Sequence, residues 1–396
     1  MKSAALYKRN LLEISHFFLA ILICSINING ANFFHTKEIF FFLFLISAMK
    51  FGSYKNLTSL FIMLFIYFFT LIANFSNPYL DLSQGLNYIF GLLYLVLLVF
   101  ANEKYQRVII ISYVISALIV AVMIISIWSI CSSSPVLKNA LLLYFGSLDT
   151  GEDAFLFMIR NRKIFSWWIL GVYYGTAPCM IPALAYSLYC FYKNNSRKYC
   201  FCALIFTTAL VLTMARANIL AALAINFFYL CIKQLKKKQK TSFFFLVCIA
   251  FVSLLVIVSL FLGDKTESSL SVKTLHKRSY INEFDSSLLN FVLMGWGAGS
   301  RFYSLGYKEW TFITELSLYE TIRRYGLIST CVIFLCIWLA PLIRFCCQKK
   351  AFAEKFFWFG AFVSYLFVAC TNPFLLGSIG FCSLFFMTTI LKYRSE

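Results

Sequence analysis

The sequence predicts an all-α polytopic integral membrane protein, and three observations point to that class. Hydrophobic residues make up 61% of the 396 residues and charged residues only 13%, whereas charged residues are about a quarter of a soluble domain. Long apolar runs alternate with short polar connectors. Lys and Arg gather in alternate connectors. We therefore expect a single transmembrane domain over residues 1–396.

About twelve apolar runs are long enough to cross a bilayer core, which needs roughly 17 to 25 residues per helix. A basic start precedes the first run and resembles a signal peptide, but the run is longer than a signal core, so we expect an uncleaved first span. The predicted spans are 12–30, 38–53, 57–75, 86–102, 108–130, 167–192, 200–214, 217–232, 242–263, 326–346, 356–372 and 374–391.

The positive charges predict an orientation. Placing both termini in the cytoplasm puts the short, densely basic connectors on the inside, as the positive-inside rule requires. Two longer connectors, 132–166 and 264–325, then lie outside. Long loops escape that rule, so their charges need another explanation. The net charge of +19 is therefore mainly topological and does not indicate a nucleic-acid partner.

The sequence has no motif for several kinds of chemistry. Most of the 14 cysteines fall within or beside spans, where they behave as small hydrophobes. The 3 histidines are far apart in sequence, and the chain has no Walker loop and no GxSxG elbow. The spans are nearly free of charge, which disfavours a transporter of ions or polar solutes. We expect neither a metal nor an organic cofactor.

Arg216 is the exception among the spans. It lies between the short runs 200–214 and 217–232, whose far ends are both basic. A tight hairpin there would carry Arg216 to the outer face, where its planar fork suits phosphate or carboxylate. Asn218 would cap the returning helix or extend the polar site. The alternative is a snorkelling arginine in a turn, or one long broken helix.

The first outer loop ends in the segment FMIRNRKIFSWW, in which three positive charges, Arg162 among them, precede Trp167 and Trp168. An interfacial amphipathic segment with a Trp belt explains this pattern. A contact to an anionic lipid-linked substrate explains it as well.

The second outer loop, 264–325, is the longest stretch that water must solvate. Its segment KTLHKRSY carries a cationic cluster suited to a diphosphate, formed by Lys273, His276, Lys277 and Arg278. Its segment GWGAGSRF supplies three glycines, with Gly297 at their centre, ahead of Arg301. Glycines let backbone N–H groups approach an anion closely, although no strand is predicted before this segment.

The end of the same loop predicts a helix that enters the membrane at Gly326. Glu315, Tyr319 and Arg323 recur every four residues on one face of it, and Glu320 pairs with Arg324 at i, i+4. Near the outer start of the helix, Glu315 is a candidate general base or sugar-hydroxyl acceptor. A surface helix with salt bridges is the alternative.

The order of these pieces carries a family resemblance. TxxR between two short helices, the glycine segment, the run TELSLYETIRRYGLI and a late TNPFLLGSIG hairpin resemble the O-antigen polymerase family of Gram-negative bacteria. The likeness covers the whole topology and is most specific from Arg278 to Gly380. The related O-antigen ligases share the topology and the arginine, but have a His-Asn pair where this chain has Thr314 and Glu315. That departure favours the polymerase.

The resemblance implies a GT-C-like, metal-independent glycosyltransferase in the bacterial inner membrane with a periplasmic active face. It would join oligosaccharide repeat units carried on undecaprenyl diphosphate. Arg216 and Arg278 would stabilise the leaving diphosphate, and Glu315 would deprotonate the attacking hydroxyl. The implied substrate-binding residues are Asn218, His276, Lys277, Gly297, Arg301, Tyr319, Arg323 and Arg162.

The implied partners are the lipid-linked oligosaccharide, membrane lipid, and a chain-length regulator and a flippase of the same pathway. Two alternatives remain at this point. One is an O-antigen ligase that transfers polysaccharide to the lipid A core. The other is a repeat-unit flippase, which would hold its arginines along a central cavity within the spans rather than at outer loops.

Overall fold

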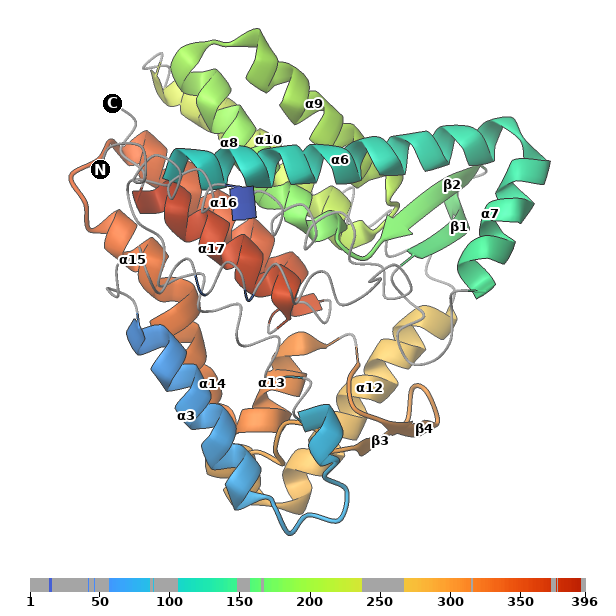
Figure 1. The fold of residues 1–396 in the computed structure, drawn as a ribbon, viewed down its shortest axis with the longest axis vertical. Helices are drawn as coiled ribbons and strands as arrows, with labels where there is room; N and C mark the ends of the chain where they lie inside the picture. The colour runs from blue at the N-terminus through green and yellow to red at the C-terminus, as the bar shows by residue number, and fades with distance from the viewer. Residues whose placement is uncertain are drawn as a thin grey trace. The chain divides into compact units, whose positions relative to one another are not determined.

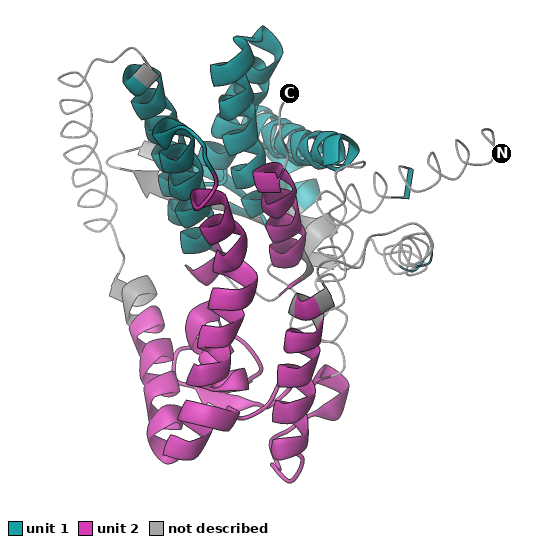
Figure 2. Cartoon of the chain, turned by 90° about the vertical axis from the view of Figure 1, so that its left-hand side faces the viewer, with its two compact units in different colours: residues 1–51, 104–264, 349–368 teal, residues 52–103, 265–348, 369–396 magenta. Residues whose placement is uncertain are grey.

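The computed structural model of the chain is mostly helical, with two short β-hairpins (Figure 1). It divides into two compact units, residues 1–51, 104–264 and 349–368, and residues 52–103, 265–348 and 369–396 (Figure 2). The structure describes residues 14, 15, 42, 46, 57–85, 88, 106–147, 157–164, 167–236, 267–314, 316–371, 375 and 377–392.

In the described parts of the first unit, the helices are α6 (Gln106–Ser133), α7 (Pro135–Ser147), α8 (Met180–Asn194), α9 (Arg197–Leu212), α10 (Arg216–Lys236) and α16 (Phe352–Thr371), with a 3-10 turn, η4 (Ala177–Cys179). Helices α6, α8, α9 and α10 pack on one another. Their contact faces carry fully buried alanines such as Ala117, Ala183 and Ala209, and small residues let apolar helices approach closely.

Strands β1 (Phe157–Ile164) and β2 (Trp167–Tyr174) form an antiparallel hairpin, so the predicted span 167–192 is wrong in its first part. Aromatic and β-branched residues fill β2, and such residues favour strands when a partner strand is available. The strand also packs closely on the α9–α10 turn, because a Cβ at Gly171 would overlap the side chain of Met214. The following helix, α8, begins only at Met180.

The second unit contains α3 (Leu57–Ala73), α12 (Glu267–Ser286), the π-helical turn η5 (Asn290–Met294) and α13 (Ser317–Tyr325). Strands β3 (Phe302–Ser304) and β4 (Glu309–Thr311) form its hairpin. A continuous helical run follows, made of α14 (Leu327–Ile333), the π-helical η6 (Phe334–Leu339) and α15 (Ala340–Cys346), and α17 (Ser378–Lys392) packs against α15. The predicted loop 264–325 is thus folded over most of its length.

Four described helical stretches are long and apolar enough to cross a membrane: Gln106–Ser133, Arg216–Leu235, Leu327–Cys346 and Phe352–Cys370. Two shorter apolar helices, Phe61–Ala73 and Ile379–Lys392, accompany them. These helices indicate membrane association. The predicted spans 12–30, 38–53, 86–102 and 242–263 lie essentially outside the described residues, so the count of about twelve and the orientation stay predictions.

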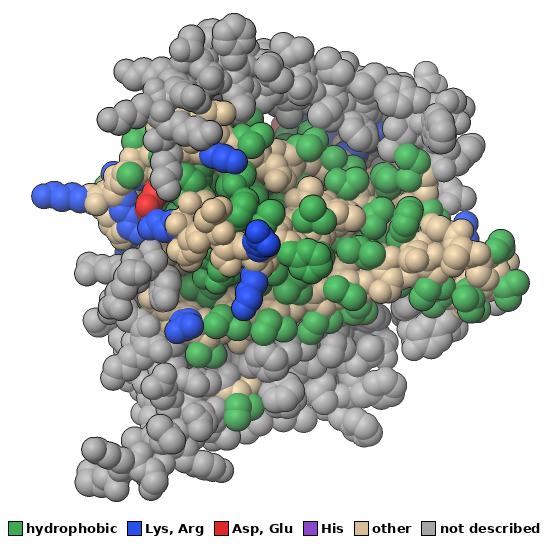
Figure 3. Space-filling model, turned by 90° about the horizontal axis from the view of Figure 1, so that it is seen from above, with side chains coloured by type: hydrophobic (Ala, Val, Ile, Leu, Met, Phe, Trp, Pro, Cys, Tyr) green, Lys and Arg blue, Asp and Glu red, His purple; other side chains and the backbone are tan. Residues whose placement is uncertain are grey.

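The predicted hairpin at Arg216 is confirmed. Helices α9 and α10 are joined by a turn of three residues, in which Met214 takes a left-handed conformation with φ of 50°. Because α8, α9 and α10 run alternately up and down, the exposed Lys193, Arg197 and Lys233 lie at the end of these helices away from Arg216. Figure 3 shows one face of the molecule, where Lys and Arg side chains gather toward one side and hydrophobic side chains cover much of the rest.

Candidate functional site

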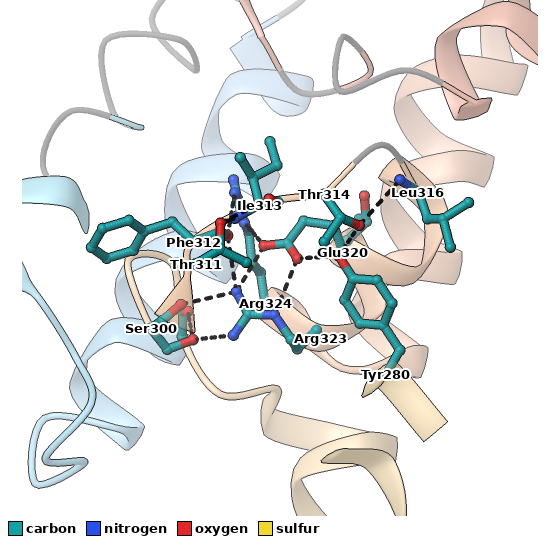
Figure 4. A network of polar contacts seen from close by, with 12 residues as sticks. Tyr280, Ser300, Thr311, Phe312, Ile313, Thr314, Leu316, Glu320, Arg323 and Arg324 are labelled. Carbon is teal, nitrogen blue, oxygen red and sulfur yellow. Dashed lines mark hydrogen bonds and ion pairs between the residues drawn. The ribbon is translucent and has the colours of Figure 1, made fainter. Parts of the chain in front are cut away.

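A buried ion network on α13 joins this helix to α12 and to the residues that flank the β3–β4 hairpin (Figure 4). Glu320 is 4% exposed and stands between two arginines of its own helix. Its Oε1 accepts from Arg323 Nη2 at 2.8 Å and from Arg324 Nε at 2.5 Å. Arg323 is fully buried and Arg324 is 4% exposed. The predicted i, i+4 pair between Glu320 and Arg324 is confirmed, but it is buried, so the surface-helix alternative is wrong.

Arg323 ties α13 to both ends of the β3–β4 hairpin. Its Nη1 and Nη2 donate to the side-chain and backbone oxygens of Ser300 at 2.7 and 2.9 Å, just before β3. Nη2 also lies 3.2 Å from the backbone oxygen of Phe312, just after β4. The planar, five-donor guanidinium is the side chain that can serve so many acceptors at once. Arg323 is therefore committed to the fold and is not exposed to a substrate.

The charges of this network reinforce one another. Burial alone would raise the pKa of Glu320, but the adjacent Arg323 and Arg324 outweigh it and hold the pKa below its usual value. Tyr280, on α12, donates to Glu320 Oε2 at 2.8 Å. Burial, with the charge of Glu320 beside it, raises the pKa of Tyr280 well above the ordinary value. The phenol therefore stays protonated and keeps donating.

The glycine segment serves the same fold. The N–H groups of Trp296 and Gly297 donate to the backbone oxygens of Arg323 and Arg324 at 2.7 and 3.1 Å. Gly295 has a φ of 65°, and a Cβ there would overlap the backbone of Arg324. The predicted anion cradle at Gly297 therefore has its N–H group already occupied, and the glycines allow α13 to pack closely instead.

The predicted cationic cluster on α12 is divided by the helix. His276 is 1% exposed, and its Nδ1 shares a 2.8 Å hydrogen bond with the Ser304 hydroxyl. It contributes to the contact between α12 and the hairpin rather than to a surface. Lys277 and Arg278 point the other way and are exposed. Their side chains make no hydrogen bond or ion pair within the described part of the chain, so both could bind an anion.

Three further predicted site residues, Tyr319, Arg301 and Arg162, lie in the described part of the chain. Tyr319 is half-buried and its ring lies parallel to that of Phe284, 6.5 Å away. Arg301 is exposed and lies 3.5 Å from a carboxylate oxygen of Asp81. Arg162 is a residue of β1, opposite Ile169. Glu315, the candidate base, lies outside the described residues, and α13 begins two residues after it.

Arg216 is the first residue of α10 and is half-buried. Its guanidinium makes no hydrogen bond or ion pair with any described residue. Asn218 is 1% exposed and donates to the Thr213 hydroxyl at 3.3 Å. That bond joins α10 to the preceding turn, but Asn218 is the third residue of the helix and donates rather than accepts, so it is not the predicted N-cap.

Sequence reasoning missed Glu283. This α12 carboxylate is half-buried and forms no hydrogen bond or ion pair within the described residues. Burial raises its pKa, which Arg323 partly counters and Glu320 reinforces. Its one sequence signal is helical spacing, because it lies three residues after the buried Tyr280.

The described residues contain no group of three or more His, Cys, Asp or Glu that is placed to hold a metal ion. The described cysteines are free thiols. The chain matches no protein-family model, no curated protein and no solved structure.

Proposed function

We propose that this chain is an O-antigen polymerase, a glycosyltransferase of the bacterial inner membrane acting at the periplasmic face. The observation that carries the proposal is Arg216, a half-buried arginine at a helix turn whose guanidinium has no partner among the described residues. A partly desolvated cation is costly without a counter-charge. A bound diphosphate would supply that charge in a planar, bidentate contact.

The exposed face of α12 supports the same chemistry. Lys277 and Arg278 are adjacent, exposed, and free of partners in the described part of the chain. Their helix belongs to the same unit as the apolar run Leu327–Cys346. Exposed cations in the same unit as a membrane-length helix suit the headgroup of a lipid-linked substrate.

The reaction would proceed at the first sugar of the growing chain. The hydroxyl oxygen of an incoming repeat unit forms a bond to the anomeric carbon, and the anomeric C–O bond to diphosphate breaks. Undecaprenyl diphosphate leaves with the bonding electron pair, and its negative charge needs a cation to stabilise it. The two candidates are Arg216, in the first unit, and Arg278, in the second. The hydroxyl proton passes to a carboxylate, for which we propose Glu315. No cofactor takes part in this scheme.

The experiment is the lipopolysaccharide banding pattern of a deletion strain complemented with variants. Loss of a polymerase leaves core carrying single repeat units, whereas loss of a ligase or a flippase leaves bare core. We expect single units from the deletion, and restoration of the ladder by wild type and by the exposed control Arg344→Ala. A bare core in the deletion strain contradicts the proposal.

A further inference from the structure

Three large aromatic side chains form an exposed cluster beside the β3–β4 hairpin. Tyr79, Tyr303 and Trp310 are 53%, 45% and 47% exposed. The rings of Tyr79 and Trp310 are stacked, with centroids 4.7 Å apart and planes within 15°. Tyr303 meets Trp310 edge-on at 6.1 Å. We call these three residues the aromatic platform.

Backbone hydrogen bonds hold the platform although its rings face solvent. Residues 79–81 lie along the glycine segment. There Arg301 N donates to Tyr79 O at 2.9 Å, and Asp81 N donates to Gly299 O at 3.0 Å. Tyr303 and Trp310 are cross-strand partners in the hairpin. The residues that flank the hairpin, Ser300 and Phe312, are held by hydrogen bonds from Arg323 to their backbone oxygens.

This anchoring fixes the rings before any ligand arrives. Two chain segments more than 200 residues apart in sequence, about 77–81 and 299–312, meet here through paired backbone groups. A preorganised surface loses little conformational entropy on binding. Rings that served only to cover a core would be buried, and these are half-exposed.

Charged side chains of both signs border the platform. Asp81 and Arg301 form a 3.5 Å ion pair in which both side chains remain accessible, at 32% and 47%. A hydrogen bond from the Ser83 hydroxyl, and others from the backbone, lower the pKa of Asp81, so its carboxylate stays ionised. Lys308 and Glu309, at the hairpin turn, are exposed. The border thus carries one carboxylate and one guanidinium, whose charges balance.

We propose that the aromatic platform binds a sugar ring of an oligosaccharide. The ring stacks on Trp310, one sugar hydroxyl donates a hydrogen bond to the Asp81 carboxylate, and another accepts one from the Arg301 guanidinium. A sugar presents an apolar C–H face and a rim of hydroxyls, which matches exposed aromatic faces next to a carboxylate and a guanidinium. The balanced charges at the border favour a neutral polyhydroxylated ligand over a polyanion. An exposed aromatic patch with a polar rim is typical of a ligand-binding surface.

The identity of the oligosaccharide, a repeat unit, rests on the proposed function. The competing explanation is an interfacial belt, in which Tyr and Trp sit among lipid headgroups. The two explanations differ in what contacts Trp310. In a sugar subsite Trp310 contacts soluble oligosaccharide, whereas in an interfacial belt it contacts lipid.

The test uses the full-length protein in lipid nanodiscs, titrated with lipid-free oligosaccharide released from the lipopolysaccharide of the source bacterium. We expect saturable binding that weakens about tenfold in Trp310→Ala and in Tyr79→Ala, in line with the loss of an aromatic contact. Trp310→Phe, which keeps an aromatic face, should retain most of the affinity. Phe75→Ala is the matched control, because Phe75 is an exposed aromatic four residues from Tyr79 and outside the stack.

A second measurement tests the sugar subsite even where a variant misfolds. In nanodiscs made with brominated lipids, Trp310 should escape lipid quenching, as judged by the difference between wild type and Trp310→Phe. Quenching of Trp310 by brominated lipid, or wild-type oligosaccharide affinity in folded Trp310→Ala, overturns the subsite. Binding does not depend on turnover, so bare core in the deletion strain would overturn the polymerase and leave the subsite standing.

Discussion

The guanidinium of Arg323 lies 2.9 Å from the backbone oxygen of Ser300, 23 residues earlier in the chain. This bond joins α13, which directly precedes a membrane-length helical run, to the start of the β3–β4 hairpin. Glu320 neutralises one of the two buried arginines that make such contacts. The hairpin and its exposed rings therefore depend on a buried carboxylate.

Replacing Glu320 should destabilise the second unit strongly. Glu320→Gln leaves Arg323 and Arg324 buried without a counter-charge, and breaking a buried pair in this way costs about 3 to 5 kcal/mol. Thermal unfolding of the detergent-solubilised protein measures the loss. Glu309→Gln, at an exposed position in the hairpin, should change the stability by less than about 0.5 kcal/mol. Equal effects of the two variants would contradict the buried network.

The same carboxylate should make the protein sensitive to acid. The pKa of Glu320 is lower in the folded chain than in the unfolded chain, so the unfolded chain binds more protons near the unfolded pKa of about 4.3. The stability that Glu320 contributes is present above that value and is lost as the pH falls through the folded pKa. Melting curves between pH 7 and pH 3 should show this loss, and Glu320→Gln should flatten it.

Glu283 should change the stability with pH in the opposite direction to Glu320. Burial raises its pKa in the folded chain, so the folded chain holds the proton more tightly than the unfolded chain does. Its contribution to stability is complete below the unfolded pKa and is lost as the pH rises through the folded pKa. Glu283→Gln should remove this loss, so that the variant gains stability relative to wild type from pH 4 to pH 8. A variant whose pH profile coincides with that of wild type would show that Glu283 is solvated.

Glu315→Gln should abolish chain extension if this carboxylate accepts the hydroxyl proton. The amide keeps the shape of the side chain but has no basic oxygen, and general-base catalysis typically contributes about 100- to 10,000-fold in rate. The ladder of lipopolysaccharide bands reports the loss, and membrane levels of the variant control for folding. A full ladder from Glu315→Gln would remove this residue from the mechanism.

The sequence predicted most described helices, because apolar length is a local property. It also predicted the hairpin at Arg216, since two basic helix ends must face the same side. The β1–β2 hairpin was missed because an aromatic, β-branched run such as 167–174 satisfies both a span and a strand by composition. Only the pairing with 157–164 distinguishes them.

The candidate site was harder to predict because burial depends on the whole fold. Arg323 and His276 belong to residue types expected at a diphosphate site, yet the structure buries both against partners of the fold. The partner of Trp310, Tyr79, lies more than 200 residues away in the chain, and no periodicity connects the two. Lys277, Arg278 and Arg216 are predicted cations whose side chains have no partner among the described residues.

The most direct test of the central claim is a reconstituted polymerisation. Purified wild-type protein in proteoliposomes is supplied with undecaprenyl-diphosphate-linked repeat units, and the saccharide chain lengths are measured by mass spectrometry. We expect products longer by whole repeat units, with release of one undecaprenyl diphosphate for each bond formed, and no extension by Arg216→Ala. Repeat units that stay single in the presence of folded wild-type protein would contradict the account.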